Sequence, residues 1–392
     1  MTRVLSLSTL FPSPVRPGFG KFVANQMAAL YRLGGVDLVM INPIGLPPFP
    51  LRLRQPYGGW AACPPQSDLG GLKVLHPRFT LIPVIGGDSN PARIAGAVLP
   101  LVRRLHAEKP FDLIDAQFFF PDGPAAAIIA RELGLPLTIK ARGSDIHYWS
   151  GRPKALSQML AAADQASALL TVSAALGRDM AALGMDEGKL RVHYTGLDRA
   201  RFQPTQRALA RAALPEKLGL MIPDGAPLLV CPGALIAIKG QALAIAALEH
   251  LPGVHLTLAG TGADEAALRQ QAAPLDGRVH FLGQVSHDAL PLLMSAADAV
   301  VLPSEREGLA NVWIEALACG APLVIPDIGG AREVVTSPMA GRIAERNAPA
   351  IAEALRELLA SPMEQGDVAE QVAGFSWDIN AMKLREIWQE VS

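Results

Sequence analysis

The chain has 392 residues, of which 50% are hydrophobic and 18% are charged, and its net charge is −1. These values exclude a disordered chain, suggest no nucleic-acid partner, and predict two domains rather than one. The three cysteines, Cys63, Cys231 and Cys319, lie far apart in the sequence, which argues against a disulfide framework and against a zinc site.

The first half of the chain alternates between strand and helix patterns. Residues 2–8 form an apolar strand pattern, a loop with two glycines follows, and residues 21–32 have the apolar spacing of a helix. A proline-rich segment at 43–65 shows no period and is interpreted as a surface excursion. Further strands are expected at 36–41, 80–85, 113–116, 135–139, 169–172 and 190–194, and further helices near 92–107, 123–133, 153–163 and 174–183. This alternation predicts a parallel sheet wrapped by helices.

A polar segment after residue 204 leads to a second set of strand patterns. Strands are expected at 228–232, 255–259, 279–282, 300–302 and 323–325, with helices between them and two more helices at 348–359 and 379–390. The second half is therefore expected to be another doubly wound domain. No apolar run reaches the roughly 18 to 20 residues that span a bilayer, and Pro12 interrupts any signal-peptide core, so we expect a cytoplasmic protein.

Charge is distributed unevenly along the chain. Residues 1–200 contain 21 Lys and Arg against 14 Asp and Glu, which gives them a charge of +7 and leaves −8 for the rest. A basic first half favours an anionic partner there, such as a lipid phosphate or the inner face of a membrane, although a difference of this size also arises by chance.

The most informative stretch runs from residue 303 to residue 320. An apolar strand pattern leads into a charged turn, and helical spacing resumes at Val312 and continues to Gly320. Glu307 and Glu315 bracket the start of this helix. Carboxylates accept hydrogen bonds from the hydroxyls of a ribose or hexose, and the N–H groups at a helix N-terminus suit a diphosphate. The alternative is that Glu307 is a solvated turn residue and Glu315 an exposed helix position.

Residues 304–308, 311–312 and 315–324 of this stretch resemble the Glu-x7-Glu signature of retaining glycosyltransferases. The resemblance implies an α/β protein with the GT-B fold, in which two Rossmann-like doubly wound domains face a cleft. It also implies an acceptor-binding domain at 1–204, a nucleotide-sugar-binding domain at 205–375, and a last helix at 376–392 that crosses back to the first domain.

The resemblance assigns roles to residues of the second half. Glu307 matches the family residue that binds the transferred sugar, and Glu315 matches the one that binds the ribose of the nucleotide. The remaining residues that we expect around the donor are Gly308, Leu309, Ala310, Asn311, Val312, Gly260, Gly262 and Gly283. Each Gly-x-Gly is a weak signal by itself.

Lys239 is expected to open a helix and to neutralise the donor diphosphate. The family also has an arginine a few residues earlier, and this chain has Ala234 in its place. A second cation, Arg142 or Arg16, is therefore expected from the first domain. The alternatives are that Lys239 and the backbone N–H groups of residues 308–312 suffice, or that catalysis has been lost. Because the chain contains no Asp-x-Asp sequence, we expect neither a metal ion nor another cofactor.

Three loops of the first half contain further candidates. The loop after the first strand carries Gly18 and Gly20, which suit close approach to a phosphate of the donor or to an acceptor, and Arg16, which is expected to bind the acceptor. In the turn at 139–145, Arg142 stands where the family often has a histidine, and Asp145 either acts in catalysis or caps the next helix. Around 118–123, Phe119 and Asp122 are expected near the acceptor, although the aromatic residues could equally fill the core.

These observations predict an enzyme that moves a sugar from a nucleotide-diphosphate donor to a saccharide or polyprenyl-linked acceptor with retention of configuration, in bacterial polysaccharide or glycoconjugate synthesis. We expect it to be cytoplasmic and peripheral on the inner face of the membrane. The substitution at Ala234 keeps open a sugar-nucleotide-binding protein without turnover. A GT-B sugar-nucleotide epimerase is the remaining alternative.

Overall fold

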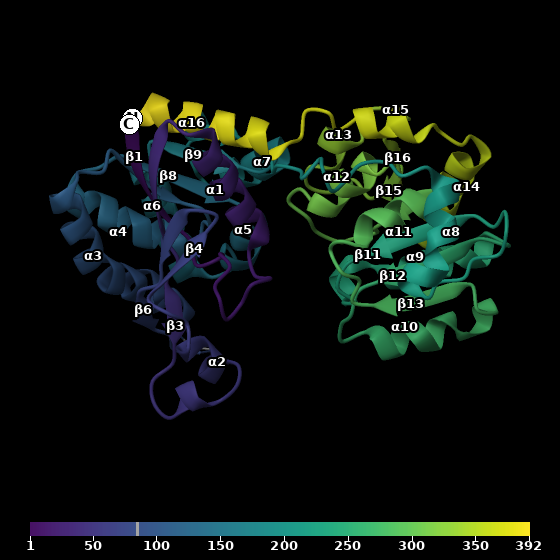
Figure 1. Ribbon diagram of the computed structural model, residues 1–392, viewed down its shortest axis with the longest axis horizontal. Coiled ribbons are helices and arrows are strands. Elements are labelled where there is room, and N and C mark those ends of the chain that lie inside the picture. Colours follow the sequence, from purple (N-terminus) through teal and green to yellow (C-terminus); the bar gives the residue numbers. More distant parts are fainter. Residues whose placement is uncertain (84–85) are drawn as a thin grey trace. The chain divides into compact units, whose positions relative to one another are not determined.

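The computed structural model describes residues 1–83 and 86–392 of the chain. It divides into two compact units, the first formed by Met1–Gly196 together with Trp377–Ser392 and the second by Leu197–Ser376 (Figure 1). Each unit is built around its own sheet of mainly parallel strands.

The sheet of the first unit has the strand order β10-β9-β8-β7-β1-β2-β5-β4, and only β4 runs antiparallel to its neighbour. The strands are β1 (Thr2–Leu7), β2 (Val36–Ile41), β4 (Gln66–Leu69), β5 (Leu72–Leu75), β7 (Leu113–Ala116), β8 (Leu137–Ala141), β9 (Ala168–Thr171) and β10 (Leu190–Val192). The order reverses between β1 and β7. Such a topological switch point, at the carboxyl ends of the strands, is where doubly wound sheets bind ligands.

Helices pack on this sheet because their sequences place apolar residues on one face. In α1 (Lys21–Leu33), the side chains of Val23, Met27 and Leu30 recur at helical spacing and are completely buried. The other helices are α3 (Asn90–Glu108), α4 (Asp122–Leu133), α5 (Ser144–Trp149), α6 (Pro153–Gln165) and α7 (Ala174–Ala182), with a 3-10 turn at η3 (Glu187–Lys189).

An excursion between β2 and β5 projects from the sheet of the first unit (Figure 1). It begins with β3 (Ile44–Leu46), which pairs with β6 (Arg78–Thr80), and continues through the 3-10 turn η1 (Leu51–Leu53) to the short helix α2 (Tyr57–Ala61). A further 3-10 turn, η2 (Gly87–Ser89), precedes α3. The proline-rich segment thus contains regular elements, although each is too short to produce a period in the sequence.

The second unit has a parallel sheet in the order β13-β12-β11-β14-β15-β16, so its switch point lies between β11 and β14. The strands are β11 (Leu228–Pro232), β12 (His255–Ala259), β13 (Val279–Gly283), β14 (Ala299–Val301), β15 (Leu323–Ile325) and β16 (Gly341–Ile343). The helices are α8 (Arg207–Leu218), α9 (Gln241–Ala247), α10 (Glu265–Ala272), α11 (Leu290–Ala296), α12 (Asn311–Ala318), α13 (Ala331–Val334), α14 (Ala348–Ala360) and α15 (Gln365–Glu370). The 3-10 turns are η4 (Ala237–Lys239), η5 (Leu248–His250) and η6 (Ala273–Leu275).

The last helix, α16 (Trp377–Val391), belongs to the first unit and packs against α1. Its Trp388 is completely buried, and the indole N–H donates to Asp115 Oδ1 at 3.3 Å. A Cβ on Gly196 would lie 2.2 Å from the ring of Trp377, so only glycine fits where the chain leaves the first unit. In the described residues, no helix is long and apolar enough to cross a membrane.

The expected α/β class with two Rossmann-like sheets is confirmed, and the structure corrects several elements. The strand expected at 80–85 is wrong in its bounds: β6 ends at Thr80, and residues 84–85 lie outside the described residues. Lys239 does not open a helix, because it ends η4 and α9 begins only after Gly240. The β4–β5 hairpin, β16 and α15 were not predicted, since each is short and lacks a clear apolar period.

Candidate active site

The loops that follow β11 and β14 meet at the switch point of the second unit. The backbone N–H of Glu305 donates to the Ile238 carbonyl at 2.7 Å, which ties these two loops together. Lys239 lies in the first loop, Glu307 in the second, and Glu315 in the helix that follows. The structure therefore brings two of the predicted donor-site residues to the place where this kind of sheet binds ligands.

Lys239 and Glu307 form an ion pair across the switch point, with 2.5 Å between Nζ and Oε1. Both side chains keep exposed surface, 26% for Lys239 and 13% for Glu307. Because the pair is not sealed from solvent, each group can exchange its partner for a ligand. An ammonium group suits a phosphate, and a carboxylate suits the hydroxyls of a sugar.

Two glycines permit the close approach of these loops. A Cβ on Gly240, whose φ is 72°, would lie 2.1 Å from the carbonyl oxygen of Pro303. A Cβ on Gly329, whose φ is 46°, would lie 2.1 Å from the carbonyl oxygen of Glu307. Any larger residue would displace one of the loops, so these glycines determine the backbone that carries Lys239 and Glu307.

The glycines predicted near the nucleotide lie in the loops after β12 and β13. A Cβ on Gly260 would be 1.9 Å from the Gly233 carbonyl, and one on Gly262 would be 2.1 Å from the Leu235 carbonyl. The loop after β12 therefore packs directly on the loop after β11. Gly283 ends β13 with a φ of 65° and open space around it. That these glycines contact a nucleotide stays a prediction.

Helix α12 begins beside the ion pair. Its N-cap is Ala310, whose methyl group offers no side-chain cap to the first turn. Leu309 is buried, whereas Gly308, Asn311 and Val312 are half-buried. The partly positive N-terminus of a helix favours an anionic ligand, so this turn suits the diphosphate that the sequence predicts here.

Glu315 lies in the second turn of α12 and is only partly exposed. Burial raises the pKa of its carboxyl group to about 7, and the positive charge of Arg201 opposes part of this rise. The group therefore changes its protonation state near neutral pH. Once ionised, it accepts hydrogen bonds from two neighbouring hydroxyls, as a ribose offers.

Ala234 occupies the position at which the family resemblance predicts an arginine. Its methyl group is exposed, and its carbonyl oxygen accepts a hydrogen bond from Gln241 Nε2 at 2.9 Å. Because the side chain points to no crowded surface, packing does not require a small residue here.

Arg142 and Asp145 lie in the first unit, in the turn that follows β8. The Asp145 carboxylate accepts from the backbone N–H groups of Phe119 (2.7 Å), Arg142 (2.9 Å) and Ile146 (3.1 Å). It thus holds the turns after β7 and β8 together, while the N-cap of α5 is Gly143. A catalytic role for Asp145 stays a prediction.

The Arg142 guanidinium is bound to the turn after β7. Its Nε donates to the Gln117 carbonyl at 3.1 Å and a terminal nitrogen to Gln117 Oε1 at 2.7 Å. Burial lowers the pKa of Arg142 to about 10, and the negative charges of Asp145 and Asp115 oppose this shift. The arginine therefore has partners within the first unit, and a role toward the donor stays a prediction.

A buried polar chain behind this turn was not predicted from the sequence. The Lys140 ammonium lies 3.0 Å from Gln26 Oε1 and 2.7 Å from His193 Nδ1, and His193 Nε2 donates to the Asn380 carbonyl at 2.8 Å. Burial lowers the pKa of Lys140 well below its usual value, and the positive charge of Arg142 adds to this. This series of hydrogen bonds connects β8 to α16. The one feature of the sequence that could have indicated these buried hydrogen bonds is Lys140, a lysine inside a mostly apolar strand.

Phe119 and Asp122 are the two residues predicted near the acceptor, and both are completely buried. Phe119 lies in the turn that follows β7, and Asp122 begins α4. Asp122 accepts from the backbone N–H and the hydroxyl of Thr9, each at 2.8 Å, and burial raises its pKa to about 7. Phe119 fills the core, which is the alternative that the sequence left open. Both residues support neighbouring turns in this structure, and acceptor contact stays a prediction.

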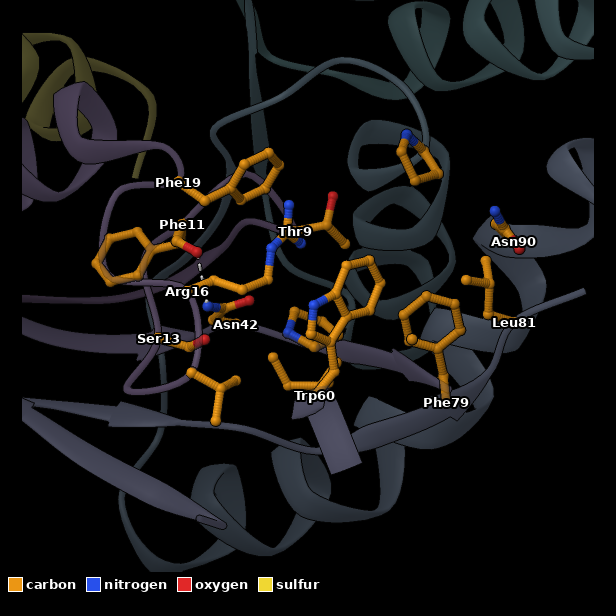
Figure 2. Close-up of a pocket in the computed structure, with 15 residues that line it drawn as sticks. Thr9, Phe11, Ser13, Arg16, Phe19, Asn42, Trp60, Phe79, Leu81 and Asn90 are labelled. Atoms are coloured by element: carbon orange, nitrogen blue, oxygen red, sulfur yellow. Dashed lines mark hydrogen bonds between the residues drawn. The ribbon is translucent and has the colours of Figure 1, made fainter. Parts of the chain in front are cut away.

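The loop after β1 carries Arg16, Gly18 and Gly20. Gly20 precedes α1 with a φ of 66°, and a Cβ there would lie 2.5 Å from a carbonyl oxygen of the same loop. Gly18 has open space around it. The Arg16 guanidinium lies between the rings of Phe19 and Trp60 (Figure 2). Sequence analysis did not single out Trp60, which comes from the excursion.

Known proteins share this sequence pattern. Residues 18–196 match the glycosyl transferase 4-like domain, and residues 216–373 match the glycosyl transferases group 1. TuaC of Bacillus subtilis strain 168, a glycosyltransferase provisionally assigned to teichuronic acid biosynthesis, is 30% identical over 405 residues, covering 100% of this chain and 99% of its own. The D-inositol 3-phosphate glycosyltransferase of Xylanimonas cellulosilytica is 30% identical over 366 residues, 85% of each chain.

Solved structures share the architecture. Sucrose-phosphate synthase from Thermosynechococcus elongatus superposes with a TM-score of 0.77 at 20% identity, over 100% of this chain and 99% of its own. HepE of Anabaena in complex with UDP-glucose superposes with a TM-score of 0.72 at 20% identity, over 100% of both chains. The expected GT-B fold is confirmed by these neighbours.

The two doubly wound sheets and their structural neighbours define the GT-B fold. The chain belongs to the glycosyltransferase family that the group 1 and 4-like domains describe.

Proposed function

We propose that this protein transfers a sugar from a nucleoside diphosphate donor to a hydroxyl of a saccharide or lipid-linked acceptor, with retention of the anomeric configuration, in bacterial polysaccharide or glycoconjugate synthesis. One observation carries the proposal: the Lys239–Glu307 ion pair lies at the switch point of the second sheet, beside the N-terminus of α12. A cation and a carboxylate at that place match a diphosphate and a sugar.

The donor occupies the carboxyl edge of the second sheet in this proposal. Glu315 accepts hydrogen bonds from the ribose, Glu307 from the transferred sugar, and Lys239 binds the diphosphate. The bond between the anomeric carbon and the diphosphate oxygen breaks, a bond from that carbon to the acceptor oxygen forms, and the proton of the acceptor hydroxyl passes to the oxygen of the leaving diphosphate. Lys239 and the first turn of α12 stabilise the charge that develops on the leaving diphosphate.

Neither a divalent ion nor another cofactor takes part in this scheme. The sequence lacks Asp-x-Asp, and Lys239 with the helix N-terminus provides the positive charge. Transfer rates that persist in excess EDTA would support this point, and rates restored only by Mg²⁺ or Mn²⁺ would contradict it. The solved complex of HepE with UDP-glucose supports a nucleotide sugar as the donor class.

We place a peripheral membrane contact at the excursion tip, residues 49–54. Three apolar side chains are exposed there: Phe49 (69%), Leu51 (41%) and Leu53 (68%). Arg52 and Arg54 lie between and beside them, and residues 38–67 contain no Asp or Glu. Apolar side chains that enter the interface and arginines that meet anionic head groups fit the inner surface of a membrane.

Ala234 favours one alternative, a protein that binds the nucleotide sugar without turnover, because a second cation near the diphosphate is missing at this position. A sugar-nucleotide epimerase would keep the donor site and need no acceptor. Both alternatives retain the ion pair, so only a functional assay separates them from a transferase.

The test uses purified full-length protein and a panel of UDP-, GDP- and ADP-sugars, with and without a membrane extract as the source of acceptors. A transferase releases nucleotide at a rate that depends on the extract, and proton NMR of the product reports the anomer. Binding without release supports the binding protein, and an altered sugar without an acceptor supports the epimerase. Inversion of the anomer would contradict retention.

A further inference from the structure

A pocket of about 210 Å³ opens at the switch point of the first sheet (Figure 2). Its walls come from the loops after β1, β2 and β7, from the excursion that carries Trp60, and from the start of α3. Doubly wound sheets bind their ligands at this place. The residues that line the pocket all belong to the first unit, so none of them is a donor residue of the second unit.

Among the described residues that line the pocket, Arg16 is the one that carries a charge. Its guanidinium carbon lies 3.6 Å from the centre of the Phe19 ring and 4.4 Å from the centre of the Trp60 ring. Burial lowers the pKa of Arg16. Within residues 1–83 and 86–392, no carboxylate forms an ion pair with this guanidinium. Asp122 is engaged by Thr9 and does not line the pocket. The pocket therefore holds a half-buried cation without a counter-ion.

The position of the two rings determines where Arg16 can bind a partner. Rings over the faces of a guanidinium attract its charge but leave its N–H groups free. The contacts with the two rings involve the charge of the guanidinium and not its N–H groups, so these donors stay available to a ligand. A planar fork of donors matches two oxygens of a carboxylate or a phosphate. The missing partner of Arg16 is consequently an anion with that geometry.

The remaining walls suit a sugar ring. Trp60, Phe79 and Phe11 supply apolar surface, and the Asn42 side chain is fixed by a hydrogen bond to the Phe11 carbonyl at 3.1 Å (Figure 2). Asn90 Oδ1 is buried and, in the described part of the chain, has no hydrogen-bond partner, so it can accept from a hydroxyl. Pockets for drug-sized ligands occupy about 300–1,000 Å³, so this smaller one suits a single sugar unit.

We infer that this pocket is an acceptor subsite for a sugar unit that carries an anionic group, a carboxylate or a phosphate, which Arg16 recognises through its N–H edge. The inference rests on the proposed transferase function and names the class of acceptor. A uronic acid and a phosphorylated sugar share the required chemistry, and the experiment distinguishes them.

Calorimetric titrations of the full-length protein with small probes test this subsite. The probes are glucuronate, glucose 1-phosphate, inorganic phosphate and neutral methyl glucoside. We expect at least one anionic sugar to bind more tightly than methyl glucoside. Arg16→Gln should weaken that binding by about 10- to 100-fold, since a charge-assisted hydrogen bond is lost. Arg178→Gln, which removes an exposed arginine elsewhere in the first unit, should leave it unchanged.

The ranking of the probes identifies the anion. Tighter binding of glucuronate indicates a uronic acid, and tighter binding of glucose 1-phosphate, with competition by inorganic phosphate, indicates a phosphorylated sugar. Trp60→Leu keeps the charge and removes one ring, so it should weaken binding several-fold even if Arg16→Gln fails to fold. Equal binding of neutral and anionic probes, or equal affinity in wild type and both pocket variants, would overturn the inference.

Titration of the same samples with nucleoside diphosphates separates this inference from the proposed function. If the protein binds a nucleoside diphosphate but shows no preference for anionic sugars, the inferred acceptor subsite is overturned and the proposed function is not. Selective binding of an anionic sugar by a protein that binds no nucleoside diphosphate would overturn the proposed transferase and leave the pocket with a different role.

Discussion

Glu315 is a carboxyl group in a place that disfavours its charge. Its pKa in the folded chain is about 7, above the value of about 4.3 for an unperturbed glutamate. The folded state therefore holds its proton more tightly than the unfolded state does, and its contribution to the free energy of unfolding becomes less favourable as the pH rises from about 4 through 7. Such a residue does not serve stability, which agrees with a binding role.

We expect Glu315→Gln to raise the free energy of unfolding at pH 8 by about 1 to 3 kcal/mol. The gain should largely disappear at pH 4, where the glutamate is protonated in the folded protein. The same variant should bind its nucleoside diphosphate about tenfold more weakly at pH 8, because the ribose loses a charged acceptor. Denaturant titrations at the two pH values measure the first effect; a gain of equal size at both would be inconsistent with the raised pKa.

Lys239→Ala removes the cation beside the leaving diphosphate. We expect kcat to fall by about 100- to 1,000-fold, as for the loss of one group that stabilises transition-state charge. Arg306→Ala is the matched control, because Arg306 lies next to Glu307 and its side chain is 52% exposed. Initial rates measure the loss of activity in both variants, and melting temperatures show whether both remain folded. A similar loss of rate in the two would show that charge near the loop, rather than Lys239, matters.

At the scale of the residue, the sequence indicated Glu307, Glu315 and Lys239 because each lies in a short segment that resembles a glycosyltransferase motif. It could not indicate Trp60 or His193, whose relevance depends on contacts between distant parts of the chain. Trp60 and Arg16 are separated by 43 intervening residues. His193 follows β10 and Lys140 lies in β8, and β9 lies between these two strands in the sheet. Neither contact leaves a period or a motif.

Helix α16 is joined to β7 by a buried hydrogen bond, in addition to its packing against α1. The carboxylate of Asp115 accepts from Ser6 and Thr138 as well as from the Trp388 indole. We expect Trp388→Phe, which keeps an aromatic ring and removes the N–H, to lower the free energy of unfolding by about 1 to 3 kcal/mol.

The control for this change is Met382→Ala on the same helix, at a side chain that is 38% exposed. It should alter the free energy of unfolding by no more than about 0.5 kcal/mol. Equilibrium denaturation of both variants provides the comparison. If both lose the same amount, general weakening of the helix rather than the hydrogen bond to Asp115 is responsible.

The excursion tip makes a prediction at the scale of an element. Phe49→Ser with Leu53→Ser should weaken binding to vesicles of phosphatidylglycerol and phosphatidylcholine by more than tenfold, since each apolar side chain contributes about 1.5 kcal/mol or more when buried. Leu209→Ser in the second unit, where the leucine is 62% exposed, should have little effect. Binding of the wild type should also fall as salt rises. No binding at low salt would exclude this surface.

The elements themselves were predictable where their apolar pattern is uninterrupted. Strands β7, β11, β12 and β15 and helices α1 and α14 have apolar patterns that local physics explains. The β4–β5 hairpin was not predictable in the same way, because its two strands of four residues alternate weakly and only their pairing defines them. The two strands of this hairpin are defined by their pairing with each other, which an apolar pattern along the sequence does not reveal.

For the whole molecule, both units follow one rule. Each sheet reverses its strand order once, between β1 and β7 in the first unit and between β11 and β14 in the second, and the chemistry-bearing residues gather at the two reversals. Alternation of strands and helices along the chain was enough to predict the α/β class. The strand order was not, because it depends on which loops cross the sheet, and this order is what places Lys239 beside Glu307.

The most direct test of the account is a calorimetric titration of the full-length protein with UDP, GDP and ADP, repeated on Glu315→Ala and on Arg178→Gln. We predict that the wild type binds one of these nucleotides clearly more tightly than the others. Glu315→Ala should bind it about tenfold or more weakly, and Arg178→Gln should match the wild type. Equal affinity of the wild type and Glu315→Ala would show that the nucleotide does not bind at α12 and would contradict the proposed donor site.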